Sequence, residues 1–135
     1  MIIWIASYPK SGNTWVRSFL TAYYFCENGT FDINKLNLIE DYPNKQFFKE
    51  KVKQGEIHKH WEESQKAICD QKKVKFLKTH NSLITAFGND FTKPEYSLGV
   101  IYIIRDPRNV ITSVKNHNDL DTYDQALKFM QDENK

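Results

Sequence analysis

Residues 8–15 combine side chains and backbone positions that suit the binding of an anion. The segment reads Tyr-Pro-Lys-Ser-Gly-Asn-Thr-Trp and contains Lys10, Ser11, Gly12, Asn13 and Thr14. Gly12 lets the backbone approach a phosphate, and Lys10 supplies a mobile positive charge, while Ser11 and Thr14 add hydroxyl donors. A helix that starts here would add free backbone N–H groups and its positive dipole end. The pattern predicts a phosphate-binding loop, although a helix cap beside an unrelated lysine has the same short signature.

The position of the lysine separates this loop from the loop that binds nucleoside triphosphates. In Gly-x-x-x-x-Gly-Lys-Ser/Thr the lysine follows the second glycine, whereas Lys10 precedes Gly12 and the first glycine is absent. The sequence also shows no obvious magnesium ligand at the end of a strand. Both features disfavour ATP chemistry and leave an atypical nucleotide kinase as a minor alternative.

Two further segments carry groups that bind anions or accept protons. Lys78-Thr79-His80 places a cation close to an imidazole, but a histidine after a strand also fits a surface or hydrogen-bonding role. Ser113 follows Arg105 by eight residues, about two helical turns. Both side chains can meet one phosphate only if that helix packs along it. The alternative for this third segment is a capped helix with a solvated Arg108 and an ordinary serine.

Apolar patterning predicts strands that lead into these three segments. The predicted strands cover residues 2–6, 74–80 and 99–105, which are largely apolar and contain β-branched side chains. In parallel α/β sheets, ligands bind beyond the carboxyl ends of the strands. Residues 10–14, residues 78–80 and the chain from Arg105 onward are therefore expected at one edge of the sheet.

Predicted helices alternate with the strands. The first begins at Thr14 and ends near Asn28-Gly29, with one broad buried face made by Trp15, Val16, Phe19, Leu20, Tyr23 and Tyr24. Asp106 can cap a second helix that has Pro107 in its first turn, and a last helix starts at about Thr122. Residues 31–71 suggest only two shorter, largely solvated helices. The alternation predicts an α/β fold with a parallel sheet flanked by helices.

Composition favours one compact domain without a disulfide framework or zinc site. The 135 residues suit a single domain, and the formal net charge of +2 neither requires nor excludes a polyanionic partner. Cys26 and Cys69 form no Cys-x-x-Cys motif, and His58 and His60 lack further metal ligands and are expected to be solvated. The apolar N-terminus is too short to span a bilayer. We expect a cytoplasmic protein with neither a membrane nor a nucleic acid as partner.

Together, the three segments resemble the motifs of the cytosolic-type sulfotransferases, which use 3′-phosphoadenosine 5′-phosphosulfate as donor. Residues 8–15 match the 5′-phosphosulfate loop closely, Lys78-Thr79-His80 has the family's Lys-Thr-His form, and residues 105–113 resemble its 3′-phosphate motif. The resemblance extends from Ile3 to about Met130 and is thin between residues 31 and 71. It implies a P-loop-NTPase-like sulfotransferase fold.

The resemblance covers about the first half of the family's domain, because no C-terminal Arg-Lys-Gly segment occurs in this sequence. We therefore expect residues 1–135 to be the N-terminal part of a single sulfotransferase domain that is incomplete at its C-terminus.

The resemblance also implies roles for individual residues. Lys10 is expected to contact the bridging oxygen of the leaving 5′-phosphate, residues 11–14 to hold that phosphate, and Trp15 to lie against adenine. Arg105 and Ser113 are expected to bind the 3′-phosphate.

The catalytic roles follow from the same resemblance. His80 is expected to take the proton from the acceptor, a task that suits a group titrating near neutrality, and Lys78 to neutralise charge on the sulfonate oxygens. The expected reaction is metal-free transfer of a sulfuryl group to a hydroxyl or amine of a small-molecule or glycan acceptor. A noncatalytic module that binds the 3′-phosphoadenosine nucleotide is the alternative.

Overall fold

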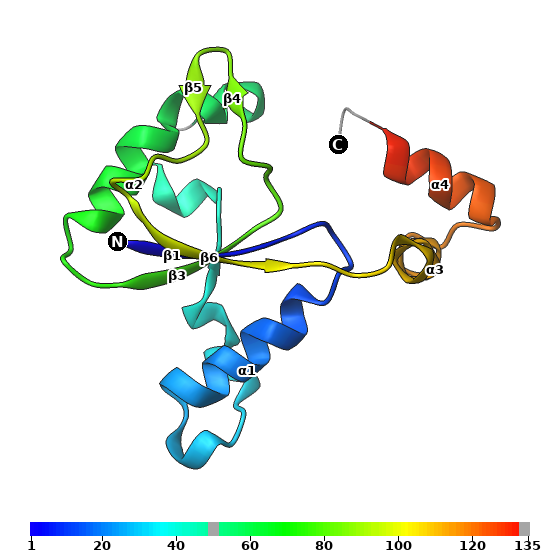
Figure 1. Cartoon of the computed structure of the whole chain (residues 1–135), viewed down its shortest axis with the longest axis horizontal. Helices are drawn as coiled ribbons and strands as arrows, with labels where there is room; N and C mark the ends of the chain where they lie inside the picture. Colours follow the sequence, from blue (N-terminus) through cyan, green and yellow to red (C-terminus); the bar gives the residue numbers. More distant parts are fainter. Residues whose placement is uncertain (49–51, 133–135) are drawn as a thin grey trace.

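The computed structural model describes residues 1–48 and 52–132, which form an α/β fold around a parallel sheet (Figure 1). Strand β1 (Ile2–Ser7) lies in its interior, between β3 (Lys75–Thr79) and β6 (Ser97–Ile103), and the short β2 (Glu40–Asp41) pairs with β3. All three pairings are parallel. The predicted parallel α/β architecture is confirmed, and β6 ends two residues before the predicted limit, so Arg105 lies in the connection that follows.

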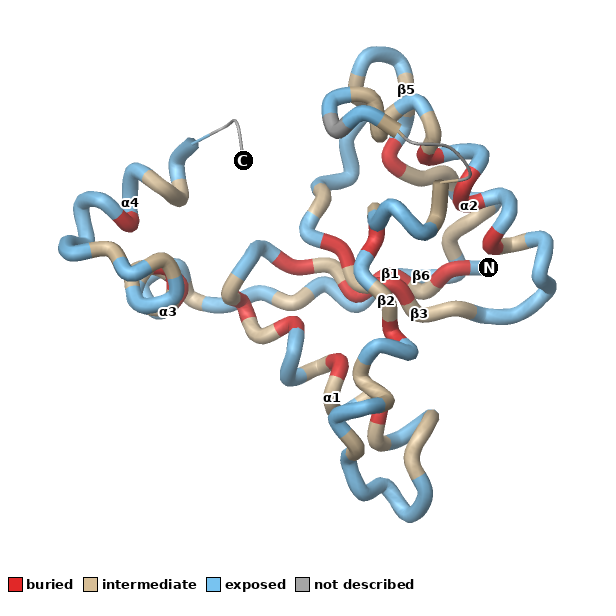
Figure 2. The backbone as a smooth tube through the Cα atoms, turned by 180° about the vertical axis from the view of Figure 1, so that it is seen from behind, coloured by how far each residue is buried: buried red, intermediate tan, exposed pale blue. Residues whose placement is uncertain are grey.

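Two helices lie on opposite sides of the sheet, α1 (Asn13–Phe25) on one and α2 (Trp61–Cys69) on the other (Figure 1). The main hydrophobic core lies on the α2 side, where the ring of Trp4 packs 5.4 Å from Tyr42 and 5.2 Å from Phe91, measured between ring centroids. Buried positions lie in the sheet, on α2 and on one side of α1 (Figure 2). Residues of β1 therefore connect the core directly to the sheet's carboxyl edge.

The predicted buried face of α1 is wrong for its aromatic residues, whereas Val16 and Leu20 are half-buried. Trp15, Phe19 and Tyr23 are 71%, 67% and 78% exposed, and the buried positions are Asn13, Arg17 and Thr21.

The polar row faces inward, and two of its side chains, those of Asn13 and Arg17, bind backbone carbonyls. Asn13 Nδ2 donates to Ile5 O at 3.1 Å, and Arg17 Nη2 donates to Ile39 O at 2.6 Å. Asn13, Arg17 and Thr21 share the four-residue spacing of the aromatic row, so periodicity alone could not tell which row faces the sheet.

The segment between α1 and β3 contains more structure than the sequence predicts. It includes the 3₁₀ segments Glu27–Gly29, Ile33–Leu38, Lys45–Phe47 and Gln54–His60. Helix α2 is not largely solvated, since it buries Trp61, Ser64, Gln65 and Ile68. A small hairpin, β4 (Thr85–Ala86) with β5 (Asn89–Asp90), was not predicted. Phe87 and Gly88, which form the turn of this hairpin, both have positive φ angles.

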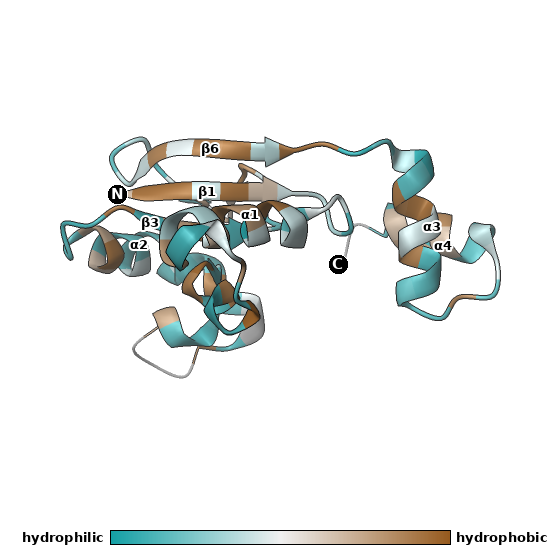
Figure 3. Cartoon of the chain, turned by 90° about the horizontal axis from the view of Figure 1, so that it is seen from below, coloured by the Kyte–Doolittle hydropathy of each residue, from teal (hydrophilic) through white to brown (hydrophobic). Residues whose placement is uncertain are grey.

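Helices α3 (Pro107–His117) and α4 (Tyr123–Gln131) cross each other and form a pair that projects from the end of β6 (Figures 1 and 3). The predicted Asp106 cap is confirmed, because Asp106 accepts from Arg108 N at 2.9 Å. Thr122, near which the last helix was expected to start, forms a capping box with Gln125 that was not predicted. Val110, Val114 and Ala126 make a second, smaller core between the two helices.

Strand β6 is an edge strand of the sheet and is largely hydrophobic (Figure 3). Leu98, Val100 and Tyr102 are 53%, 61% and 65% exposed on the face that they share with Trp4. None of the helices in the described part of the chain is long and apolar enough to cross a membrane.

Candidate functional site

A cleft of about 930 Å³, the strand-end cleft, opens at the carboxyl edge of the sheet and is lined both by residues that follow the strands and by residues of α3 and α4. It brings together most of the residues that the sequence singled out, namely Lys10, Gly12, Asn13, Thr14, Trp15, Lys78, His80, Arg105 and Ser113. Ser11 is the exception, because its side chain is buried rather than part of the lining. The three sequence segments therefore meet at one place.

The loop before α1 is shaped by two residues with left-handed backbone geometry. Lys10 has φ 65° and Gly12 has φ 103°, a conformation that strongly favours glycine. Ser11 N donates to Tyr8 O at 3.2 Å, which closes the turn. As a result, the first turn of α1 starts at the cleft, and its backbone N–H groups and positive dipole end lie at an anion-binding position.

Asn13 anchors the loop to the sheet instead of reaching into the cleft with its carboxamide. Its Nδ2 donates to Ile5 O and to Ser7 Oγ, both at 3.1 Å, and the residue is only 6% exposed. The part of Asn13 that remains suited to a phosphate is thus its backbone N–H, at the start of the helix.

Lys78 enters the cleft with a carboxylate partner that sequence reasoning missed. Its Nζ lies 3.2 Å from Asp41 Oδ2, and Asp41 Oδ1 lies 3.3 Å from Arg17 Nη1. Asp41 belongs to the two-residue strand β2, which no periodicity could reveal. The pairing draws Lys78 toward β2 and reduces the positive potential that it offers to an anion.

His80 is oriented by the backbone of β1. Its Nδ1–H donates to Ser7 O at 2.7 Å, and Nδ1 also lies 3.3 Å from Ser7 Oγ. This bond selects the tautomer in which Nε2 is unprotonated and can accept a proton. Partial burial of the ring lowers the pKa of His80 below the usual 6.5, outweighing the opposing effect of the bond to Ser7 O. At neutral pH the imidazole is therefore a neutral base.

Arg105 and Ser113 line the same cleft from the far side. Arg105 Nη1 donates to Lys10 O at 3.1 Å, which ties the end of β6 to the phosphate loop. Arg108 instead turns back onto Asp106, with Nη2 at 2.6 Å from Oδ2, and its side chain is 89% exposed. Of these two arginines, the one that the resemblance singled out is the one that lines the cleft.

Apart from Ser113, the residues of the wall that the α3–α4 pair contributes were not assigned from the sequence. Ser113, Val114, His117 and Asn118 come from α3 and its end, and Phe129 and Met130 come from α4. Tyr8 OH donates to Met130 O at 3.3 Å across the cleft. Motifs could not reveal the wall, because its two halves come from different helices and meet only through the packing of α3 against α4.

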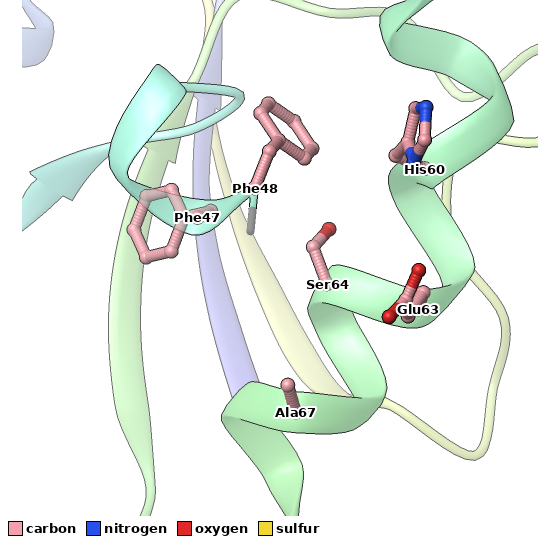
Figure 4. Close-up of a pocket in the computed structure, with 6 residues that line it drawn as sticks. All are labelled: Phe47, Phe48, His60, Glu63, Ser64 and Ala67. Carbon is pink, nitrogen blue, oxygen red and sulfur yellow. The ribbon is translucent and has the colours of Figure 1, made fainter. Parts of the chain in front are cut away.

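Two further pockets, besides the strand-end cleft, differ in size. One, lined by Phe47, Phe48, His60, Glu63, Ser64 and Ala67, has a volume of about 20 Å³, which is near the space that one water needs (Figure 4). The other, the sheet-face groove, has a volume of about 650 Å³ on the α2 side of β1 and β6. It shares Tyr8, His80, Asn81 and Ser82 with the strand-end cleft.

The expectation that His58 and His60 are solvated is wrong. Both are half-buried against aromatic rings: His58 lies 5.0 Å from Phe87 and His60 lies 6.2 Å from Phe48, between ring centroids. Within residues 1–48 and 52–132, no three histidine, cysteine, aspartate or glutamate side chains group together as a metal site would require.

A parallel sheet with a helix N-terminus, two lysines and an arginine at its carboxyl edge is an arrangement by which α/β proteins can bind phosphate-containing ligands. The family model described as the sulfotransferase domain matches residues 2–133, and the chain belongs to this family. Comparisons with the curated proteins and with the solved structures gave no match.

Proposed function

We propose that the chain binds 3′-phosphoadenosine 5′-phosphosulfate in the strand-end cleft and transfers its sulfuryl group to a hydroxyl or amine. The observation that carries this proposal is the convergence on one cleft of the Lys10 loop, Lys78 with His80, and Arg105 with Ser113. Proteins of the sulfotransferase family generally use this donor. A ligand with phosphates at two positions fits a cleft that has cationic groups on both sides.

The donor's 5′ end fits the start of α1. The backbone N–H groups of residues 13 and 14 and the hydroxyl of Thr14 would hold the 5′-phosphate, with Lys10 at the oxygen that joins it to sulfur. Arg105 and Ser113 would hold the 3′-phosphate. Trp15, which is exposed and lines the cleft, offers a ring face to the adenine.

The transfer requires one proton acceptor and stabilisation of the leaving phosphate. The acceptor oxygen or nitrogen attacks sulfur in line, its bond to sulfur forms as the bond from sulfur to the 5′-phosphate oxygen breaks, and its proton passes to Nε2 of His80. Lys78 balances the charge on the sulfonate oxygens and Lys10 that on the leaving oxygen. 3′-Phosphoadenosine 5′-phosphate is released.

Calorimetric titration with 3′-phosphoadenosine 5′-phosphate tests the donor site. Arg105→Ala should weaken binding about tenfold or more, the usual loss when a charge-assisted hydrogen bond is removed. Arg108→Ala is the matched control, because Arg108 is exposed and paired with Asp106. Equal losses in the two variants would contradict the assignment of the cleft.

Transfer from radiolabelled donor to a panel of alcohols and amines tests the reaction itself. Binding of the nucleotide without transfer to any acceptor would indicate a noncatalytic nucleotide-binding module. Turnover of ATP that depends on magnesium would instead support a nucleotide kinase.

A further inference from the structure

We infer that Arg17 is a positioning residue for the proposed sulfuryl transfer. By binding one oxygen of Asp41, Arg17 limits the hold of this carboxylate on Lys78, so that the ammonium group stays able to turn to the donor. The inference rests on the proposed function and adds to it a residue that does not line the strand-end cleft.

The sheet places Asp41 and Lys78 side by side on the face that α1 covers. The two residues are register partners of β2 and β3, and Lys78 is also the register partner of Ile5 in β1. Successive side chains of a strand point to opposite faces, and the ring of Trp4 packs on the α2 side. Lys78 and Asp41 therefore point to the other side, where Arg17 reaches Asp41 from the inward row of α1.

The two cations divide the carboxylate of Asp41 between them. Arg17 Nη1 lies 3.3 Å from Oδ1, and Lys78 Nζ lies 3.2 Å from Oδ2. A carboxylate attracts each cation less strongly when a second cation already balances part of its charge. Without Arg17, both oxygens of Asp41 would be available to the ammonium group, and Lys78 would be drawn away from an anion in the cleft.

Arg17 is fixed in this arrangement, whereas the side chain of Lys78 can change partners. Arg17 Nη2 donates to Ile39 O at 2.6 Å and to Leu36 O at 3.3 Å, and the residue is only 8% exposed. An arginine keeps its charge in proteins, and these two bonds do not depend on Asp41. Lys78 instead carries a point charge on a flexible stem, and it lines the strand-end cleft. When the donor arrives, Lys78 is therefore the group that exchanges Asp41 for the sulfonate.

Calorimetric titration with 3′-phosphoadenosine 5′-phosphate and single-turnover transfer from the radiolabelled donor test the inference. Arg17→Gln removes the guanidinium charge but retains an amide N–H that can donate to a backbone carbonyl. Because Asp41 then holds Lys78 alone, the nucleotide affinity and the transfer rate should each fall about two- to fivefold, the scale of a solvent-screened ion pair. Arg17→Met removes the same charge and carries the comparison if Arg17→Gln does not fold.

Addition of Asp41→Asn to Arg17→Gln should reverse both losses. Once the carboxylate is neutralised, it no longer competes with the donor for Lys78, so the affinity and the transfer rate should return at least to the values of the unsubstituted chain. If Arg17 only stabilised the fold, Asp41→Asn would remove a further contact and would restore neither quantity.

Lys75→Gln is the matched control for the loss of one positive charge. Lys75 also lies on β3, but it pairs with Glu40 instead of Asp41, so its removal should change neither the affinity nor the rate. Arg17→Lys keeps a positive charge beside Asp41 and loses the second arm of the guanidinium group. Its nucleotide affinity should therefore stay within about twofold of the unsubstituted chain, even where urea denaturation shows a loss of stability.

A measurement without nucleotide separates this inference from the proposed function. Acetylation of the Lys78 amine by acetic anhydride can be followed by mass spectrometry of peptides. It should be slower in Arg17→Gln than in the unsubstituted chain and faster in Asp41→Asn, because a tightly paired ammonium group reacts less readily.

The outcomes keep the two proposals apart. Losses in Arg17→Gln that Asp41→Asn reverses, together with slower acetylation of Lys78, support the inference. Unchanged affinity or unchanged acetylation in Arg17→Gln, a loss that persists in the double variant, or an equal loss in Lys75→Gln or Arg17→Lys overturns it. If the unsubstituted chain binds no nucleotide, the proposed function is wrong, and the acetylation rates alone decide whether Arg17 limits the hold of Asp41 on Lys78.

Discussion

His80 and Lys78 are two residues apart on the chain and reach the cleft with different kinds of support. The imidazole is fixed by a backbone carbonyl of the adjacent strand, whereas the ammonium group is held by a carboxylate, Asp41, that a substitution can remove. Their contributions can therefore be separated experimentally.

The rate of transfer should fall on the acid side as His80 takes up a proton. Only the neutral imidazole can act as a base, and burial lowers the pKa of His80, so full activity should persist to a lower pH than an unperturbed histidine allows. The acid limb of kcat/KM should have its midpoint below 6.5. A midpoint at or above this value would contradict the role of the buried ring.

Removal of the His80 side chain should slow transfer about 10²–10⁴-fold, the usual contribution of a general base. Binding of 3′-phosphoadenosine 5′-phosphate should change little, because the imidazole acts on the acceptor. Single-turnover assays of His80→Ala and nucleotide titrations measure the two effects. His117→Ala is a control from another wall of the same cleft, and comparable losses in both variants would argue against a special role for His80.

Neutralisation of Asp41 should tighten the binding of the nucleotide. Asp41→Asn removes a negative charge beside Lys78, and the gain should be about 0.5–1 kcal/mol, or two- to fivefold in Kd, because solvent screens a half-exposed carboxylate. Glu40→Gln, the neighbouring substitution, removes a carboxylate that pairs with Lys75 instead. Titrations at low salt should show the gain for Asp41→Asn and little change for Glu40→Gln.

At the scale of secondary structure, α1 shows that hydrogen bonding can override hydrophobic periodicity. Its aromatic row is exposed and its row of Asn13, Arg17 and Thr21 faces the sheet. The contributions of the two rows to stability can be compared by truncating one residue of each, Asn13 and Phe19.

Asn13→Ala should destabilise the protein by about 1–3 kcal/mol, since it leaves buried acceptors without their donor. Phe19→Ser should change the free energy of unfolding by no more than about 0.5 kcal/mol, as exposed substitutions usually do. Urea denaturation measures both. The opposite order would mean that the aromatic row is the buried one after all.

The three long strands and the Asp106 cap could be predicted from the sequence, because they depend on local signals. Runs such as residues 99–103 and the Asp106-Pro107 pair carry their information within a few positions. The orientation of α1, the strand β2 and the wall from α3 and α4 could not be predicted. Each depends on partners distant in sequence, such as Ile39 for Arg17 and Met130 for Tyr8.

The candidate site was predictable to a similar extent. Its motif residues were identified, and most of them line one cleft. The inward orientation of the Asn13 side chain and the pairing of Lys78 with Asp41 were not predicted. The direction of a side chain is set by neighbours that a short motif does not contain. The sheet-face groove left no motif, since it arises from side chains that alternate along β1 and β6.

At the scale of the whole molecule, the cleft lies between two bodies with separate cores. The sheet is stabilised by the cluster around Trp4, and the α3–α4 pair by a much smaller cluster around Val114. The wall of the cleft that carries Ser113 therefore belongs to the less stabilised part.

Amides of α3 and α4 should exchange with solvent at a lower opening free energy than those of β1 and β3, because fewer buried side chains oppose their opening. Native-state hydrogen exchange followed by mass spectrometry measures the difference. Addition of 3′-phosphoadenosine 5′-phosphate should slow exchange in α3 if Ser113 contacts the ligand. Uniform protection across both bodies would show that they open as a single unit.

Ser7 accepts hydrogen bonds from both sides of the cleft, with its hydroxyl bound to Asn13 and its carbonyl bound to His80. One residue at the end of a central strand thus joins the phosphate loop to the base. The spacing between them is consequently set by a few short bonds rather than by a flexible connection. In the proposed transfer, a sulfuryl group and a proton acceptor held in this way would keep their alignment through thermal motion, so that little ordering entropy would be lost during the chemical step.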